Sequence, residues 1–91
     1  MIPKTFQIFG ETYKIKQVLK VNKDGRWGEH DPNGNIIRIK KDLNEEQKEQ
    51  AYYHEMIHAI LTNLSYDKLN TDEEFVDRFA KALHQILKTS K

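Results

Sequence analysis

The chain has 91 residues, enough for one domain near the lower size limit for a self-sufficient hydrophobic core. Charged residues make up 32% of it and balance to a net charge of +1, which gives no reason to expect binding to nucleic acid or to an acidic membrane. It has no cysteine, so disulfides and thiolate ligands are excluded, and any transition-metal site must use imidazole and carboxylate groups.

The first ten residues have neither the basic start nor the apolar run of a signal peptide. No stretch of the sequence reaches the length that a membrane-spanning helix needs. A cytoplasmic location is therefore the default expectation.

The first half of the chain predicts strands. In residues 5–21 apolar side chains alternate with polar ones on both sides of a break at Gly10 and Glu11, which indicates two strands joined by a turn. Segments 26–31 and 36–40 predict a second pair, separated by the strong turn signal Pro-Asn-Gly-Asn. We therefore expect a small antiparallel sheet of about four strands.

A helix is predicted next. Asn44, followed three residues later by Gln47, resembles a capping box, and the acidic residues directly after Asn44 suit the start of a helix. Apolar residues then recur at helical spacing and define one face: Tyr53, Ile57, Ile60, Leu61 and Leu64. The early turns are polar and the later ones apolar nearly all round, so the later half should enter the interior.

A second helix is predicted after the polar segment 65–70. Thr71 and Glu74 have the spacing of another capping pair. Its expected buried stripe consists of Val76, Phe79, Ala80, Leu83, Ile86 and Leu87. The chain is therefore predicted to be a single α+β domain over residues 1–91, with a small sheet followed by two packed helices.

The most informative residues are His54, Glu55 and His58, which form the pattern His-Glu-x-x-His on the first helix. Residues four apart lie on the same face of a helix, so two imidazoles can point at one zinc ion. The carboxylate of Glu55 emerges beside them, where it can take a proton from a zinc-bound water. The alternative is an accidental match, in which two buried histidines hydrogen-bond to backbone carbonyls.

A zinc site needs a third protein ligand, and two adjacent candidates stand at the start of the second helix. At about 100° per residue, Glu73 shares a face with Val76 and Ala80, at the margin of the predicted buried stripe. Glu74 lies on the solvent side and has a possible role in the cap. We therefore expect Glu73 to be the ligand, with Glu74 as the competitor.

Segments 54–58 and 72–83, His-Glu-Met-Ile-His and the glutamate helix, resemble the gluzincins, zinc peptidases in which a downstream glutamate completes the site. The closest likeness is to compact ImmA/IrrE-type metallopeptidases and their short relatives in phages and prophages. Glu73 and Asp77 match that family's spacing, which implies that Asp77 orients a zinc-bound histidine. Val76 and Asp77 stand where many members have Ala-Asn, and these 91 residues contain no helix-turn-helix domain.

The resemblance implies a minimal zincin-like fold and an edge strand beside the metal, for which segment 26–31 is the candidate. The other candidates for the site favour plainer roles. His30 and His84 are expected to be surface or boundary residues. Three tyrosines could supply a hydroxyl near the metal but are expected to be core or rim packing groups: Tyr52, Tyr53 and Tyr66. Trp27 is expected in the core or in the wall of a cleft.

The predicted function is hydrolysis of a peptide bond, with one zinc ion per chain held by His54, His58 and Glu73 and with Glu55 as general base. The expected partner is a polypeptide, either a substrate or a bound protein. The rival interpretation is a zinc-stabilised binding module with little or no turnover, because so small a core would be strengthened by a metal linking its helices.

Overall fold

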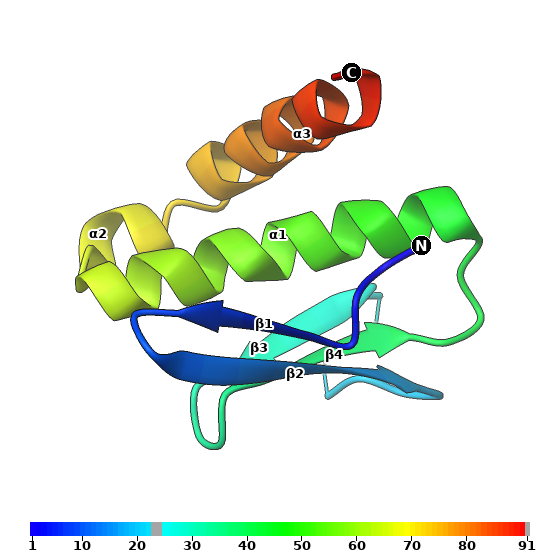
Figure 1. The fold of residues 1–91 in the computed structure, drawn as a ribbon, viewed down its shortest axis with the longest axis horizontal. Coiled ribbons are helices and arrows are strands. Elements are labelled where there is room, and N and C mark those ends of the chain that lie inside the picture. Colours follow the sequence, from blue (N-terminus) through cyan, green and yellow to red (C-terminus); the bar gives the residue numbers. More distant parts are fainter. Residues whose placement is uncertain (23–24, 91) are drawn as a thin grey trace.

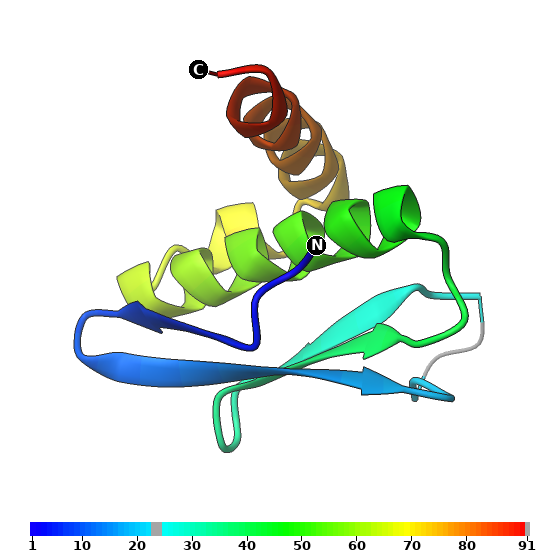
Figure 2. The ribbon, with the colours of Figure 1, turned by 45° about the vertical axis from the view of Figure 1, so that its right-hand side comes forward.

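A computed structural model describes residues 1–22 and 25–90 of the chain, and Figure 1 shows how the elements are arranged. In chain order they are β1 (Thr5–Ile8), β2 (Glu11–Val18), β3 (Gly28–Asp31), β4 (Ile36–Lys40), α1 (Glu45–Leu64), α2 (Asp67–Asn70) and α3 (Glu73–Thr89). Helix α1 lies between the sheet and α3, so the α+β architecture has three successive layers (Figure 2). None of the helices described is long and apolar enough to cross a membrane.

The four strands form one mixed sheet in the order β1-β2-β4-β3. The outer pairs are antiparallel, but β2 and β4 are parallel, so the prediction of a wholly antiparallel sheet is wrong. After β2 the chain passes the place of β4 and forms the edge strand β3 first. It then returns through a hairpin, which makes β4 run parallel to β2. Burial explains this order, because Ile37 and Ile39 of β4 are 0% exposed and need the centre of the sheet, whereas β3 is polar.

One face of the sheet carries the larger part of the core. Tyr13 and Ile15 of β2 alternate with exposed neighbours and pack with the isoleucines of β4 against α1. The helix contributes small and aromatic side chains to this cluster, chiefly Ala51, Tyr52 and Ala59. This contact fixes the position of α1 on the sheet, and it therefore also fixes the distance of His54 and His58 from the sheet.

The cap of α1 is confirmed. The amide of Gln47 donates to Oδ1 of Asn44 at 2.8 Å, and the amide of Asn44 donates back to the Gln47 side chain at 3.2 Å. Both bonds satisfy backbone donors that the first turn of a helix leaves free. The helix ends at Ser65, which adopts the left-handed conformation and closes the last turn.

The predicted cap of α3 is wrong. Asp72 is the N-cap and accepts a hydrogen bond from the amide of Phe75 at 3.1 Å. Thr71 instead terminates the short helix α2, where its hydroxyl donates to the carbonyl of Lys68. Because that extra helical turn occupies Thr71, the capping role moves one residue along the chain, and Glu74 has no part in it.

The predicted buried stripe of α3 is only partly buried. Val76 and Ala80 pack against Ile57 and Leu61 of α1, but Phe79, Ile86 and Leu87 are each at least half exposed. Figure 2 shows α3 crossing α1 at an angle, and the exposed side chains are those that the α1–α3 cluster does not include. His84 takes one of the buried positions in their place, at 7% exposure.

Candidate metal centre

Helix α1 carries His54 and His58 one turn apart on the side that faces α3. Their ring centroids lie 5.1 Å apart, and both side chains are largely covered by the protein. The core contacts of α1 with the sheet leave this side of the helix for the two imidazoles. The structure thus brings both predicted histidines to one place.

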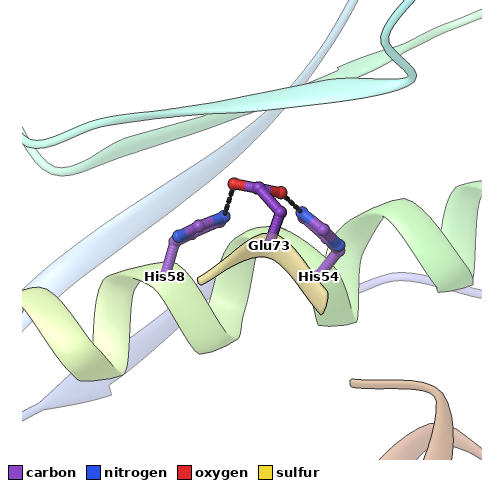
Figure 3. Close-up of side chains that lie close together, drawn as sticks. All are labelled: His54, His58 and Glu73. Atoms are coloured by element: carbon purple, nitrogen blue, oxygen red, sulfur yellow. Dashed lines mark hydrogen bonds and ion pairs between the residues drawn. The ribbon is translucent and has the colours of Figure 1, made fainter. Parts of the chain in front are cut away.

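Glu73, the first residue of α3, brings its carboxylate between the two rings, as Figure 3 shows. One oxygen lies 3.2 Å from Nε2 of His54, and the other lies 3.1 Å from Nε2 of His58. The three groups offer ligand atoms that all lie within 4.8 Å of one another. Glu74 points elsewhere and forms an exposed ion pair with Arg78 at 3.5 Å.

Asn70 holds His58 from behind and is a site residue that the sequence reasoning missed. Its Oδ1 lies 2.6 Å from Nδ1 of His58, and its Nδ2 donates to Thr62 at 2.9 Å. Because the amide nitrogen is turned toward Thr62, the oxygen must accept the proton of Nδ1. With its proton on Nδ1, the neutral ring of His58 has Nε2 free to bind a metal ion, and this nitrogen lies 3.1 Å from the Glu73 carboxylate.

Asp77 lies one turn along α3 from Glu73 and on the other side of His54. Its Oδ1 is 3.7 Å from Nδ1 of His54, which is an ion-pair distance and too long for a hydrogen bond. Its second oxygen pairs with Lys81 at 2.9 Å. The carboxylate therefore stands next to the histidine that it was expected to orient, with a longer contact than Asn70 makes to His58.

Glu55 is 4% exposed and is packed against the edge strand. A Cβ atom at Gly28 would lie 2.9 Å from the carbonyl oxygen of Arg38 and 3.3 Å from Cγ of Glu55. Glycine is therefore needed for the close pairing of β3 with β4 at this point, and it also leaves room for the side chain of Glu55. Burial raises the pKa of Glu55 to about 7, although the nearby charges of His58 and Arg26 act in the opposite direction.

Burial also lowers the pKa of His54, and repulsion from His58 adds to this effect. A lowered pKa keeps the imidazole neutral at physiological pH, with a lone pair available. The neutral ring can accept a metal ion without first losing a proton. His54 therefore offers a lone pair of the kind that a metal ion needs.

The site is open on two sides. A cavity of about 380 Å³ extends from His54 toward Trp27, and one of about 590 Å³ extends from His58 toward Pro32. Both cavities are lined by Glu55 and Glu73, so the candidate centre lies where they meet. Strand β3 forms the opposite wall of this cleft.

The remaining candidates have other surroundings. His84 is buried and bonds through Nε2 to Glu49 at 2.9 Å, so the expectation of a surface or boundary residue is wrong for it. His30 is half-buried on β3, and its Nε2 has no hydrogen-bond partner in the part of the chain that is described. Tyr52 is a core residue whose pKa burial raises to about 12. Tyr66 is exposed at the surface.

Comparisons of the chain with protein-family models, curated proteins and solved structures found no match.

Proposed function

We propose that the chain is a zinc-dependent peptidase domain with a zincin-like fold, in which His54, His58 and Glu73 hold one zinc ion and Glu55 is the general base. The observation that carries the proposal is the convergence of two imidazole Nε2 atoms on the carboxylate of Glu73, beside a buried glutamate. The resemblance of segments 54–58 and 72–83 to the gluzincins supports the same assignment.

The donor set fits zinc. Two imidazole nitrogens and one carboxylate oxygen are ligands that zinc prefers, and three protein ligands leave a fourth position for water. The orientation of His58 by Asn70 supplies the support that a metal-binding imidazole usually has. Among the described residues, the only basic groups within 4 Å of the Glu73 carboxylate are the two imidazoles, so its charge is suited to a metal cation.

Bound zinc would polarise the scissile carbonyl and lower the pKa of a water molecule. Glu55 then supplies the proton transfers. In the metal-free chain burial raises the pKa of Glu55 to about 7. Beside a bound zinc ion its carboxylate would be in place to accept a proton from water and to release it again. It takes a proton from the attacking water and passes it to the leaving amine.

Strand β3 is suited to hold the substrate backbone. It pairs with β4 on one side only, and it lies at the edge of the sheet against the two cavities. An extended peptide can hydrogen-bond to the free side of such a strand and lie across the metal site. The cleft is short, so a substrate of a few residues or an unfolded segment fits it best.

A second candidate function is a zinc-stabilised module that binds a protein without cleaving it. The observation in its favour is the modest fully buried core between α1 and α3. Among the described residues it consists of Ile57, Leu61, Val76 and Ala80, with partly buried apolar side chains packed around them. A metal ion that joined the two helices would stabilise the domain whether or not it catalysed a reaction.

The test compares the unaltered chain with Glu55→Gln at matched zinc content, on a peptide library and on an unfolded protein. The amide keeps the shape of the side chain but cannot accept a proton, so hydrolysis should fall by about 10² or more while zinc stays bound. Glu74→Gln is the matched control, because its exposed carboxylate contacts neither the histidines nor the cleft. Equal cleavage by the chain and Glu55→Gln would refute the mechanism, and zinc binding without cleavage by either would favour the module.

A further inference from the structure

The cavity of about 380 Å³ beside the candidate metal centre has walls of three different elements. Trp27, just before β3, lies on one side, and Ala51 of α1 and Ala80 of α3 lie on the other. Glu55 and Glu73 form the end nearest the proposed zinc site. A peptide held along β3 with its scissile bond at this end would place one neighbouring side chain in the cavity.

The cavity owes its depth to small residues. Ala51 of α1 and Ala80 of α3 are both buried and both line the cavity, so a longer side chain at either position would take up part of the open space. The methyl groups leave room for a substrate group, and Trp27 offers it a large apolar surface.

One residue that lines the cavity, His84, is held in a fixed position. Its Nε2 bonds to Glu49 at 2.9 Å, and its ring stacks on Tyr53 with centroids 5.1 Å apart. One nitrogen of the imidazole is thus already engaged, and the ring is held in place from two sides.

The charges around the cavity favour neither an acidic nor a basic guest. Lys81 is paired with Asp77 at 2.9 Å at the rim. Arg26 lies opposite Glu55, and Glu73 would be compensated by the metal. With positive and negative groups in balance, the apolar walls decide what binds.

The cavity on the other side of the centre differs in kind. Its walls include Arg38, which is bonded to Glu29 at 2.9 Å and to Asp31 at 3.3 Å. No tryptophan lines it in the part of the chain that the structure describes. The first cavity therefore offers an apolar side chain a tryptophan to pack against, and the second does not.

We propose that this first cavity is a specificity pocket that accepts a large apolar side chain, aromatic above all, from the substrate residue next to the scissile bond. The inference rests on the proposed zinc site. Trp27 favours an aromatic side chain by stacking on it, and the small side chains of Ala51 and Ala80 leave room for it.

Two matched pairs of hydroxamates test the pocket without any need for turnover, because a hydroxamate binds zinc directly. N-acetyl-phenylalanine and N-acetyl-alanine hydroxamates extend to one side of the zinc-binding group, and benzylsuccinyl and methylsuccinyl hydroxamates extend to the other. Titration calorimetry on the zinc-loaded chain should show the benzyl compound binding at least about tenfold tighter in the pair that reaches the cavity. The affinities of the two compounds in the other pair should differ less.

Variants assign that preference to the pocket. Trp27→Ala should reduce the benzyl-to-methyl ratio about three- to tenfold, whereas Trp27→Phe should retain most of it. Phe79→Ala is the matched control, since Phe79 is half exposed on the side of α3 away from this cavity. Zinc content and the affinity for the methyl compound should be the same in all four proteins.

The outcomes separate this proposal from the zinc site on which it rests. If no hydroxamate binds to the zinc-loaded protein, the proposed zinc site with an open coordination position is refuted. If all bind and neither benzyl compound is preferred, or if Trp27→Ala keeps the full ratio, the centre stands and the specificity pocket is refuted.

Discussion

Two clusters of histidine and glutamate join α1 to α3, and they differ in what neutralises them. The first consists of His54, His58 and Glu73, and the second of Glu46, Glu49 and His84. In the second cluster the chain supplies its own cations: Lys88 bonds to Glu46 at 2.6 Å, and the amino group of Met1 bonds to Glu49 at 2.8 Å.

The first cluster has no such internal cation within 4 Å of Glu73 among the described residues, only the two imidazoles. The pKa shifts show the same contrast. The pKa of Glu49 is lowered by its bonds to the Met1 amine and to His84, which marks a satisfied ion pair. The pKa of His54 is lowered by burial, which marks a neutral ligand. Similar residue types therefore make an internal ion-pair network in one place and a proposed zinc site in the other.

The largest effect on zinc affinity is expected when His58 of the first cluster is compared with His84 of the second. His58→Ala should weaken zinc binding by more than about 100-fold, because it removes a direct ligand. His84→Ala should leave zinc affinity almost unchanged, although it opens a buried site and lowers the melting temperature. Competition titrations against a chelator measure both. A comparable loss of zinc affinity in His84→Ala would mean that the second cluster is the metal site.

The same comparison extends to the glutamates. Glu73→Ala should weaken zinc affinity at least as much as the loss of a group that orients a ligand, about 10- to 100-fold or more. Glu74→Ala is the matched control one residue along the helix and should bind zinc normally, since its carboxylate pairs only with Arg78. The reverse ranking of these two variants would contradict the placement of α3.

A smaller loss of zinc affinity is expected from Asn70. Asn70→Ala removes the acceptor that fixes the tautomer of His58, so zinc affinity should fall about 10- to 100-fold. Asn70→Asp, which restores an acceptor, should recover most of it. The titrations should be made at constant pH, because free imidazole also binds protons. An unchanged affinity in Asn70→Ala would show that His58 needs no support from α2.

The stability of the folded chain should respond in opposite ways to the ionisation of Glu55, which is buried, and of Glu49, which is ion-paired. In metal-free protein the pKa of Glu55 is raised from 4.5 to about 7 by burial, so the folded chain holds this proton more tightly than the unfolded chain. The free energy of unfolding is therefore highest below about pH 4.5, where the carboxyl is neutral in both states. It falls by on the order of 2–3 kcal/mol as the pH rises to about 7. Glu55→Gln should remove this loss. Denaturant titrations of both proteins from pH 4 to 8, with chelator present, measure the difference, and parallel curves would contradict it.

The smallest effect is expected at Glu49. Its pKa lies below 4.5, so its contribution to stability is present above that pH and lost as the pH falls through the lowered pKa. Glu49→Gln should therefore lower the melting temperature slightly at pH 7 and not at pH 3. Thermal scans at the two pH values measure this. An equal effect at both would show that the contact with His84 and Met1 is not ionic.

Local rules predicted the local parts of this structure. The capping residues fixed the start of α1, and helical spacing indicated which of two adjacent glutamates turns toward the histidines. Glu73 does lie between them, while Glu74 faces solvent. The four strands were also found, because alternation of apolar residues needs no knowledge of their partners.

Features that depend on distant partners were not predicted. The parallel pairing of β2 with β4 follows from strand order, which alternation does not encode. His84 is buried because Glu49, 35 residues away in the chain, receives its hydrogen bond. Asn70 belongs to a four-residue helix that is too short and too polar to leave a periodic signal. Phe79 is exposed because α3 crosses α1 at an angle that its own sequence does not specify.

The most direct test of the central claim is the location of zinc in a crystal grown without chelator and soaked with zinc, from anomalous scattering at the zinc absorption edge. We expect one strong peak per chain, about 2.0–2.2 Å from Nε2 of His54, Nε2 of His58 and a Glu73 oxygen. We expect no peak at Glu46, Glu49 and His84, whose charges the chain already satisfies. A peak at that second cluster, or none at His54, His58 and Glu73, would refute the proposed zinc site.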